Sequence, residues 1–261
     1  MKETDVCKHN QVAWDNQVDQ CNRWTKPVDR ETTQRAITGD FAIVLTPTKP
    51  VPANWFPSLK GSEALCLASA GGQQAPILAA AGARVTVFDN SPRQLDQDRF
   101  VADRDGLEMK FVEGDMADLS VFSDESFDFI FHPCSNTFVP KVLPVWQECH
   151  GVLRSGGVLM AGFTNPMRYI FDDEREQNGN LEVRYSLPYS DLDHVDEGHI
   201  REAINTGKPL EFGHTLEDQI GGQLRVGFML TGFYQDRFTK SDNDPLSAFF
   251  DTFVATRAVK R

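Results

Sequence analysis

The fold of this chain follows from the stretch Leu65-Cys66-Leu67-Ala68-Ser69-Ala70-Gly71-Gly72, a short apolar run that ends in small residues. The run predicts a strand over Glu63–Ala68, since buried parallel strands are short and almost continuously apolar. A helix is expected over Ala75–Ala81, because Pro76 suits a first turn and Gly82 suits a C-terminal cap. Small residues let a ligand approach the backbone, and a helix N-terminus offers free N–H groups. The stretch therefore predicts a ligand-binding turn between a strand and a helix.

Strand-like and helix-like segments alternate downstream of this turn. Strands are predicted over Arg84–Phe88, Met109–Glu113, Phe127–His132 and Val158–Phe163, and helices over Pro92–Arg104, with Ser91 as N-cap, and Val142–Leu153. This alternation predicts a parallel sheet with helices on both faces.

The last part of the chain returns to an ordered pattern. Thr215 to Asp218 resembles a capping box, which predicts a helix to about Gly227, and strands are expected over Met229–Asp236 and Phe249–Val259. The predicted fold is α/β: a doubly wound, Rossmann-like, seven-stranded and mostly parallel sheet whose last strand is antiparallel.

Two zones differ in texture from this sheet pattern. Residues 1–58 are polar and aromatic and close on a proline cluster (Pro47, Pro50, Pro52 and Pro57), which predicts a helical N-terminal cap and an extended connector. Residues 59–261 form the predicted main domain, and within it the charged, turn-rich residues 164–214 form an insertion that covers the acceptor.

Composition excludes several classes of function. Lys and Arg number 26 against 38 Asp and Glu, and the net charge of −12 disfavours nucleic-acid binding. No apolar run reaches the roughly 18 residues of a membrane helix, and the first residues lack the apolar core of a secretory signal. The five cysteines show no CxxC spacing, so we expect free thiols in the cytoplasm and no metal site. The oligomeric state stays open.

Polar residues follow the predicted strands at the edge where their carboxyl ends meet. They are Asp89, Asp115 and His132, and Asp115 is flanked by Gly114 and Met116. Asp89 follows Gly71 by 18 residues, close to the separation of about 20 between a glycine turn and a ribose-binding acid. The pattern predicts a pocket for an adenosine-type cofactor. The residues around Asp89 could also only cap a helix, and His132 could be a hydrogen-bonded strand-end residue.

A dinucleotide or a P-loop nucleotide fits this turn less well. A dinucleotide turn has the pattern GxGxxG, and the corresponding residues here are Ala68, Ala70 and Gln73. No GK[ST] sequence follows a glycine run.

Five motifs in order resemble class I S-adenosylmethionine-dependent methyltransferases, over about residues 60–163. They are Leu65–Gly72, Val85–Ser91, Val112–Leu119, Phe127–His132 and Val152–Leu159. Within that class the chain is similar to small-molecule methyltransferases of the ubiquinone and menaquinone biosynthesis group.

The resemblance implies S-adenosylmethionine as the cofactor and a role for each matched residue. Ala68–Gly72 would line the methionine end, Asp89 would hold the ribose hydroxyls, Asp115 would bond the adenine amino group, and Met116 would pack on the ring. The full set of implied cofactor-binding residues is Ala68, Ser69, Ala70, Gly71, Gly72, Asp89, Asn90, Ser91, Asp115, Met116, Ala117 and His132. The sequence departs from the family at Cys66, where an acidic residue is usual, and at Ala68 and Ala70, where glycines are usual.

The implied activity is methyl transfer to a small acceptor whose identity and acceptor atom the sequence leaves open. His132 is the candidate general base, because it stands where the family places residues that face the methyl group and because an unperturbed pKa near 6.5 suits a base at neutral pH. Two alternatives stay open: a non-catalytic nucleoside-binding sensor or assembly protein, and an NAD(P)-dependent reductase.

Overall fold

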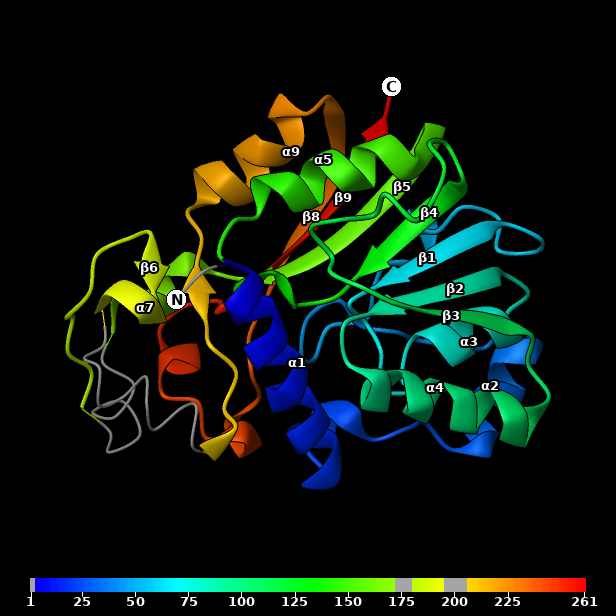
Figure 1. Ribbon diagram of the computed structural model, residues 1–261, viewed down its shortest axis with the longest axis horizontal. Coiled ribbons are helices and arrows are strands. Elements are labelled where there is room, and N and C mark those ends of the chain that lie inside the picture. Colours follow the sequence, from blue (N-terminus) through cyan, green and yellow to red (C-terminus); the bar gives the residue numbers. More distant parts are fainter. Residues whose placement is uncertain (1–2, 172–179, 195–205) are drawn as a thin grey trace.

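A computed structural model describes residues 3–171, 180–194 and 206–261 (Figure 1). Its main feature is one seven-stranded sheet in the order β3-β2-β1-β4-β5-β9-β8. The strands are β1 (Glu63–Leu67), β2 (Arg84–Asp89), β3 (Met109–Glu113), β4 (Phe127–His132), β5 (Leu153–Thr164), β8 (Phe228–Asp236) and β9 (Phe253–Lys260).

Parallel pairing joins the first five strands, and β9 alone runs antiparallel to both of its neighbours. This confirms the predicted fold class. The chain order reverses between β1 and β4, which is the position where open α/β sheets bind ligands at the carboxyl ends of their strands.

Helices cover both faces of the sheet. On one face lie α2 (Arg30–Ile37), α3 (Ala75–Ala80) and α4 (Pro92–Asp105), and on the other lie α5 (Leu143–Val152) and α9 (Gly222–Arg225) (Figure 1). Two further helices, α1 (Glu3–Asp19) and α7 (Asp191–His194), lie outside these layers. On β1 the side chains alternate: Cys66 belongs to the core beneath α3 and α4, whereas Leu65 belongs to the core beneath α5. Burial on both faces explains why this strand has no polar side of its own.

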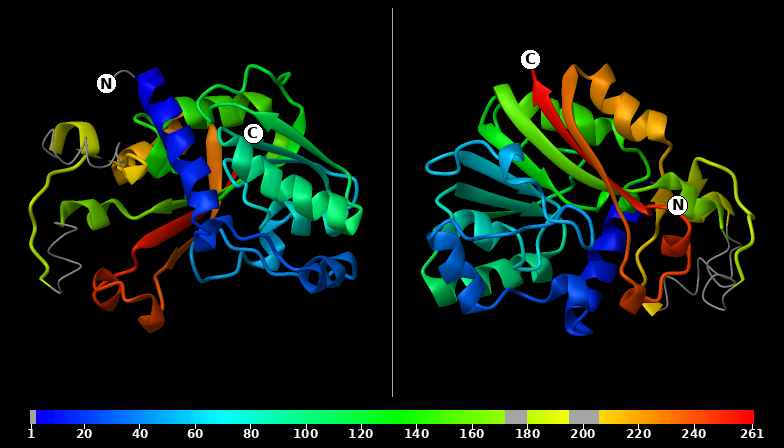
Figure 2. Two further views of the ribbon diagram at one scale, coloured as in Figure 1. Left: turned by 60° about the horizontal axis from the view of Figure 1, so that its bottom comes forward. Right: turned by 180° about the vertical axis from the view of Figure 1, so that it is seen from behind.

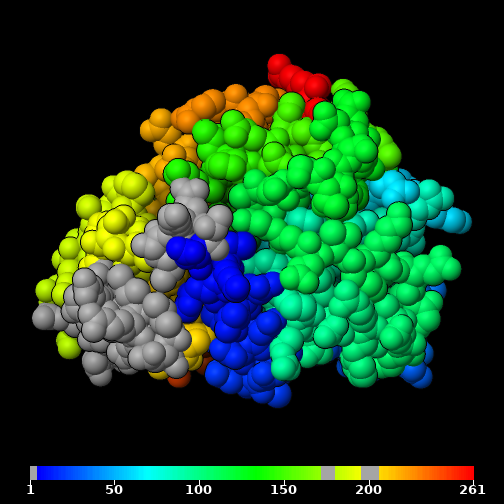
Figure 3. All heavy atoms as spheres, in the orientation of Figure 1, coloured from blue at the N-terminus to red at the C-terminus, as the bar shows by residue number. Residues whose placement is uncertain are grey.

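The helix α1 is not part of either layer. It crosses the edge of the sheet where the strands end, as two further views confirm (Figure 2). On the surface it lies between the described residues 180–194 and the body of the sheet domain (Figure 3).

Several predicted boundaries differ from those in the structure. Strand β5 begins at Leu153 and not at the expected Val158. The residues Ser155-Gly156-Gly157 are part of this strand, whose register against β4 is irregular. Strand β9 begins at Phe253 and not at the expected Phe249, since a short 3-10 helix, η7 (Leu246–Ala248), precedes it. The helix after Thr215 begins as a π-helical turn, η5 (Glu217–Gly221), before α9.

The predicted insertion contains a second, two-stranded sheet, β6 (Tyr189–Ser190) with β7 (Phe212–Gly213), that the sequence pattern does not indicate. None of the helices in the described ranges has the length and apolarity needed to cross a bilayer.

Candidate active site

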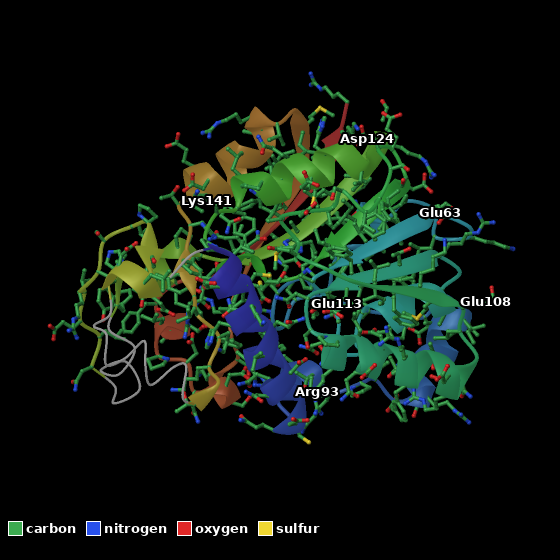
Figure 4. All side chains as sticks on the ribbon, in the orientation of Figure 1. Glu63, Arg93, Glu108, Glu113, Asp124 and Lys141 are labelled. Carbon is green, nitrogen blue, oxygen red and sulfur yellow. The ribbon has the colours of Figure 1, made fainter. Side chains whose placement is uncertain are left out.

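A cavity of about 510 Å³ opens at the carboxyl edge of the sheet. Its walls come from the turns after β1, β2, β3 and β4, from α1, and from the segment that includes Leu45 and Thr46. Figure 4 shows the edge: Glu113, at the end of β3, lies beside α1, whereas Glu63, the first residue of β1, and Glu108, just before β3, lie away from it. Elements far apart in sequence therefore enclose one space.

The small-residue turn after β1 forms part of the wall. Ala68, Ser69 and Ala70 line the cavity, whereas Gly71 and Gly72 do not. Both glycines have positive φ angles, 106° and 73°, which favour glycine. A Cβ atom on Gly71 would lie 2.8 Å from Gln94 Oε1, so a larger residue has no room there. The glycines shape the turn, and the three residues before them face the ligand space.

Asp89 lies at the tip of β2 and lines the cavity. Its Oδ1 accepts the Ser91 N–H at 3.0 Å and its Oδ2 accepts the Ala70 N–H at 3.3 Å. Burial raises the pKa of Asp89 to about 6, against the opposing effect of these bonds. The carboxylate is thus held in place and joins the turn after β1 to the turn after β2.

The turn after β3 brings Asp115, Met116 and Ala117 to the cavity. Asp115 Oδ1 accepts the Ala117 N–H at 3.0 Å, which fixes the carboxylate within its own turn. Gly114 packs under the Phe88 ring so closely that a Cβ atom would lie 2.3 Å from it. The turn therefore needs glycine at that position for Phe88 to face the cavity.

The turn after β2 anchors α1. Asn90 lines the cavity, and its carbonyl accepts a hydrogen bond from Gln11 Nε2 at 2.7 Å. Ser91 is fully buried and does not line the cavity; it caps α4 and donates to Asp15 Oδ1 at 2.6 Å. The helix-capping interpretation of Ser91 is thus confirmed, and its side chain has a second partner on α1.

His132 does not line the cavity, contrary to what a catalytic or cofactor-binding role requires. Its side chain is fully buried, with Nδ1 bonded to the Leu67 carbonyl at 2.8 Å and Nε2 bonded to the Asn136 side chain at 2.5 Å. Burial lowers its pKa. The geometry therefore supports the alternative interpretation, a hydrogen-bonded residue at a strand end that ties β4 to β1.

Aromatic residues from the N-terminal zone also line the cavity. They are Trp14 of α1 and Trp24 of the short helix η1 (Arg23–Thr25). The Trp14 ring meets Phe138 edge-on, with centroids 5.1 Å apart. The connector contributes as well: Thr46 Oγ1 donates to Asp236 Oδ2 of β8 at 2.8 Å, which holds the connector against the sheet. These walls surround the ligand space opposite the strand tips.

A polar part of the cavity wall was not found from the sequence. Tyr169 donates to Glu211 Oε2 at 2.8 Å, and the Thr137 hydroxyl is hydrogen-bonded to the same phenol. All three residues line the cavity. They come from the turns after β5 and β4 and from the insertion, so no local motif joins them.

Two residues of α4 were also missed. Gln94 lines the cavity, and Asp98, which is fully buried, accepts the Gly71 N–H on Oδ2 at 3.0 Å. Their spacing of one helical turn is the only sequence signal that they share a face.

Other histidines of the predicted insertion lie elsewhere. His214 bonds the Asn136 carbonyl at 3.0 Å, and His194 packs on Tyr189, neither of them in the cavity wall. His199 lies outside the described residues.

Comparisons with known proteins agree with this geometry. Residues 65–161 match a family described as a methyltransferase domain. The uncharacterized methyltransferase YbaJ of Bacillus subtilis is 50% identical over 252 residues, which cover 97% of this chain and 97% of that protein. Sterol 24-C-methyltransferase erg-4 of Neurospora crassa is 29% identical over 177 residues, 67% of this chain and 41% of that protein.

A solved S-adenosylmethionine-dependent methyltransferase from Mesorhizobium loti shares the fold, with a TM-score of 0.59 and 16% identity over 79% of this chain and 94% of that one. These proteins give no support to a reductase or a nucleoside sensor. Because half of its residues are identical to those of a methyltransferase over almost its whole length, the chain belongs to the class I S-adenosylmethionine-dependent methyltransferases.

Proposed function

We propose that the chain moves the methyl group of S-adenosylmethionine to a small acceptor that is enclosed in the same cavity. One observation carries this proposal: Asp89 and Asp115 at the strand tips line the same cavity as Tyr169 and Glu211. Its volume of about 510 Å³ lies within the range of about 300–1,000 Å³ that is typical of small-ligand sites.

The strand tips suit the nucleoside part of the cofactor. Asp89 holds a carboxylate at the cavity wall, where its oxygens can accept hydrogen bonds from both ribose hydroxyls. Asp115 provides an acceptor for the adenine amino group, and Met116 with Phe88 provides apolar surface for the ring. The neighbouring Asn90 and Ala117 complete this part of the wall.

The turn after β1 suits the methionine part. Ser69 and Gln94 line the cavity, and the Ser69 hydroxyl oxygen and Gln94 Oε1 are buried without a hydrogen bond to the described residues. Buried polar atoms of this kind normally have partners, so a polar ligand group at this place would satisfy them. The residues present therefore fit the cofactor that the family uses.

When bound, the cofactor supplies a methyl group on a positively charged sulfur, which is already activated for transfer. The protein has to align the acceptor with that group and keep water out. Trp14, Trp24 and Phe138 provide apolar walls for this purpose. The acceptor is small in this proposal because α1 and the connector close the space on two sides.

Tyr169 is the residue that would orient the acceptor. Burial and the Glu211 carboxylate raise the pKa of Tyr169 well above its usual value, so the phenol stays protonated near neutral pH. A protonated phenol that donates to Glu211 can accept a hydrogen bond from an acceptor O–H or N–H. During transfer the acceptor O or N would form its bond to the methyl carbon while the bond between that carbon and the cofactor's sulfur breaks. Tyr169 would then take the acceptor proton and pass its own phenol proton to Glu211.

The test combines a binding measurement with a transfer measurement. Calorimetry with S-adenosylhomocysteine should show binding, and methyl-labelled S-adenosylmethionine should label at least one member of a panel of small amines, phenols and thiols. With that acceptor, Tyr169→Phe should lower kcat by about 10²-fold, typical of lost acid–base assistance, and leave S-adenosylhomocysteine binding unchanged.

Two results would overturn the proposal. Stabilisation by NADH but by neither sulfur nucleoside would remove the cofactor assignment. Transfer only to a macromolecule would remove the small acceptor.

A further inference from the structure

The small sheet of β6 and β7 packs directly against Tyr169. Tyr189 of β6 stacks on the Tyr169 ring, with centroids 5.3 Å apart and an angle of 19° between the ring planes. Gly213 of β7, which pairs with Tyr189, lies so close that a Cβ atom on it would be 2.6 Å from the Tyr169 ring. Both strands therefore fix the ring of a residue that lines the cavity.

Asp191, the first residue of α7, joins the two strands of this sheet. Its Oδ1 accepts the Tyr189 hydroxyl at 2.7 Å, and its Oδ2 accepts the Glu211 N–H at 2.7 Å. The Asp191 N–H in turn donates to the Glu211 carbonyl at 3.1 Å. One residue thus binds both the side chain that stacks on Tyr169 and the residue whose carboxylate accepts the Tyr169 hydroxyl.

The Asp191 carboxylate faces these two partners and not the ligand space. It does not line the cavity, and it makes no ion pair with the described residues. Burial raises the pKa of Asp191, whereas the bonds from Glu211 and Tyr189 lower it. A partly buried carboxylate without a cation is unfavourable unless it is well hydrogen-bonded, so its two bonds are what keep it in this place.

Alignment decides how well Tyr169 and Glu211 can work as a pair. Tyr169 belongs to the short helix η4 (Pro166–Ile170) and Glu211 directly precedes β7, so the 2.8 Å hydrogen bond between them joins separate segments. A displacement of about 1 Å at such a pair can lower a rate by about 10²-fold. The pair therefore needs a link between the two segments, and Asp191 provides one.

We propose that Asp191 is a positioning residue for methyl transfer, which aligns Tyr169 with Glu211. One of its oxygens holds the Glu211 backbone, and the other holds the Tyr189 ring that supports Tyr169. The inference rests on the role of Tyr169 in the proposed function. It concerns only the acceptor side of the cavity, so cofactor binding should not depend on Asp191.

A spectroscopic test needs no acceptor. The chain has four tyrosines, so protein labelled with 3-fluorotyrosine should give four fluorine NMR signals, which are assigned by replacing each tyrosine with phenylalanine in turn. In Asp191→Ala, which removes both side-chain bonds, we expect the Tyr169 signal to shift or broaden. The signal of Tyr234 on β8 should stay the same. An unchanged Tyr169 signal in the folded variant would overturn the proposal.

The kinetic test is a double-mutant cycle, with the small acceptor that methyl labelling identifies. Asp191→Ala should lower kcat by about 10- to 100-fold and leave the calorimetric affinity for S-adenosylhomocysteine unchanged. In protein that already carries Tyr169→Phe, the same substitution should lower kcat no further, because Asp191 acts through Tyr169. An equal loss in both backgrounds would indicate general damage and overturn the proposal.

Matched variants separate the two hydrogen bonds from charge and from folding. Asp193→Ala removes an exposed carboxylate from the same helix and should change neither kcat nor the Tyr169 signal. Asp191→Asn keeps an oxygen for the Glu211 N–H and an amide that can donate to the Tyr189 oxygen, so it should retain most of kcat. A loss as large as that of Asp191→Ala would overturn the role of these bonds. If Asp191→Ala does not fold, Tyr189→Leu, which removes the stacked ring, replaces it in both tests and should give the same results.

The outcomes distinguish this proposal from the proposed function. If Tyr169→Phe alone leaves kcat unchanged, the role of Tyr169 in the proposed function is wrong, and the role of Asp191 with it. If Tyr169→Phe lowers kcat and Asp191→Ala does not, only the role of Asp191 is wrong.

Discussion

Asn10 and Leu210 exchange two hydrogen bonds although 200 residues separate them in the chain. Asn10 Nδ2 donates to the Leu210 carbonyl at 3.0 Å, and the Leu210 N–H donates to Asn10 Oδ1 at 2.7 Å. Asn10 Nδ2 also donates to the Phe138 carbonyl at 2.9 Å. One buried amide therefore holds α1 against both the insertion and the turn after β4.

Replacing this amide should loosen α1. Asn10→Ala leaves buried backbone groups of Leu210 and Phe138 without partners, which should lower the free energy of unfolding by about 1–3 kcal/mol in urea titrations. Val12→Ala is the control: this side chain of α1 is 51% exposed, so the substitution should change the free energy of unfolding little. Equal stability of the two variants would contradict the role of Asn10.

Cofactor affinity should depend on pH through Asp89. The pKa of Asp89 is raised to about 6, so the carboxylate that accepts the ribose hydroxyls is present above that pH and is lost as the pH falls below it. We expect the affinity for S-adenosylhomocysteine to decrease between pH 7 and pH 5, as calorimetry at several pH values would show.

Asp89→Asn should lower the affinity at pH 7.5 by about 1–3 kcal/mol and remove this part of the pH dependence. An unchanged pH profile in the folded variant would exclude Asp89 from the ribose site.

His132 should affect stability and its pH dependence. Burial lowers the pKa of His132 below its ordinary value of 6.5, so the unfolded chain takes up a proton at a higher pH than the folded chain does. The stabilisation that neutral His132 provides is therefore present above pH 6.5 and is lost as the pH falls below it.

His132→Phe removes the bonds to Leu67 and Asn136 and should cost about 1–3 kcal/mol at pH 7.5, and less at pH 5.5. Urea titrations at the two pH values measure this difference. His9→Gln, at an exposed hydrogen bond to Lys208, serves as the control. A penalty that does not shrink at low pH would show that His132 does not titrate on unfolding.

Gly114 should tolerate no larger side chain. A Cβ atom there would lie 2.3 Å from the Phe88 ring, so Gly114→Ala must displace a ring that lines the cavity. Overpacking of this kind costs about 1–3 kcal/mol, and we expect weaker binding of S-adenosylhomocysteine in addition.

Gly151→Ala is the matched control, because a Cβ atom on that helical glycine of α5 would meet only Asp124 Oδ1, at 3.6 Å. Its stability should be unchanged or higher by about 0.5–1 kcal/mol. Thermal unfolding and calorimetry measure both variants. Equal stability and equal affinity for S-adenosylhomocysteine in the two variants would contradict the predicted clash with the Phe88 ring.

The sequence by itself determined the sheet and the turns at its edge. The apolar run before Gly71, the position of Asp89 at a strand tip and the Ser91 cap are local features, because periodicity, turn chemistry and helix capping act over only a few residues. Such local signals place Ala68–Ala70, Asp89 and Asp115 at one edge once the strands pair, and the structure brings these residues to one cavity.

Only the tertiary structure decided which side chains face the ligand space. His132 and Ser91 lie at strand ends as Asp89 does, but their side chains are hydrogen-bonded within the protein. His132 bonds Leu67 and Asn136, and Ser91 bonds Asp15. Tyr169 and Glu211 reach the cavity from other segments, through packing that no local pattern encodes. The physical reason is that a side chain's direction and its hydrogen-bond partners depend on contacts between segments far apart in the chain, as Asn10 and Leu210 show.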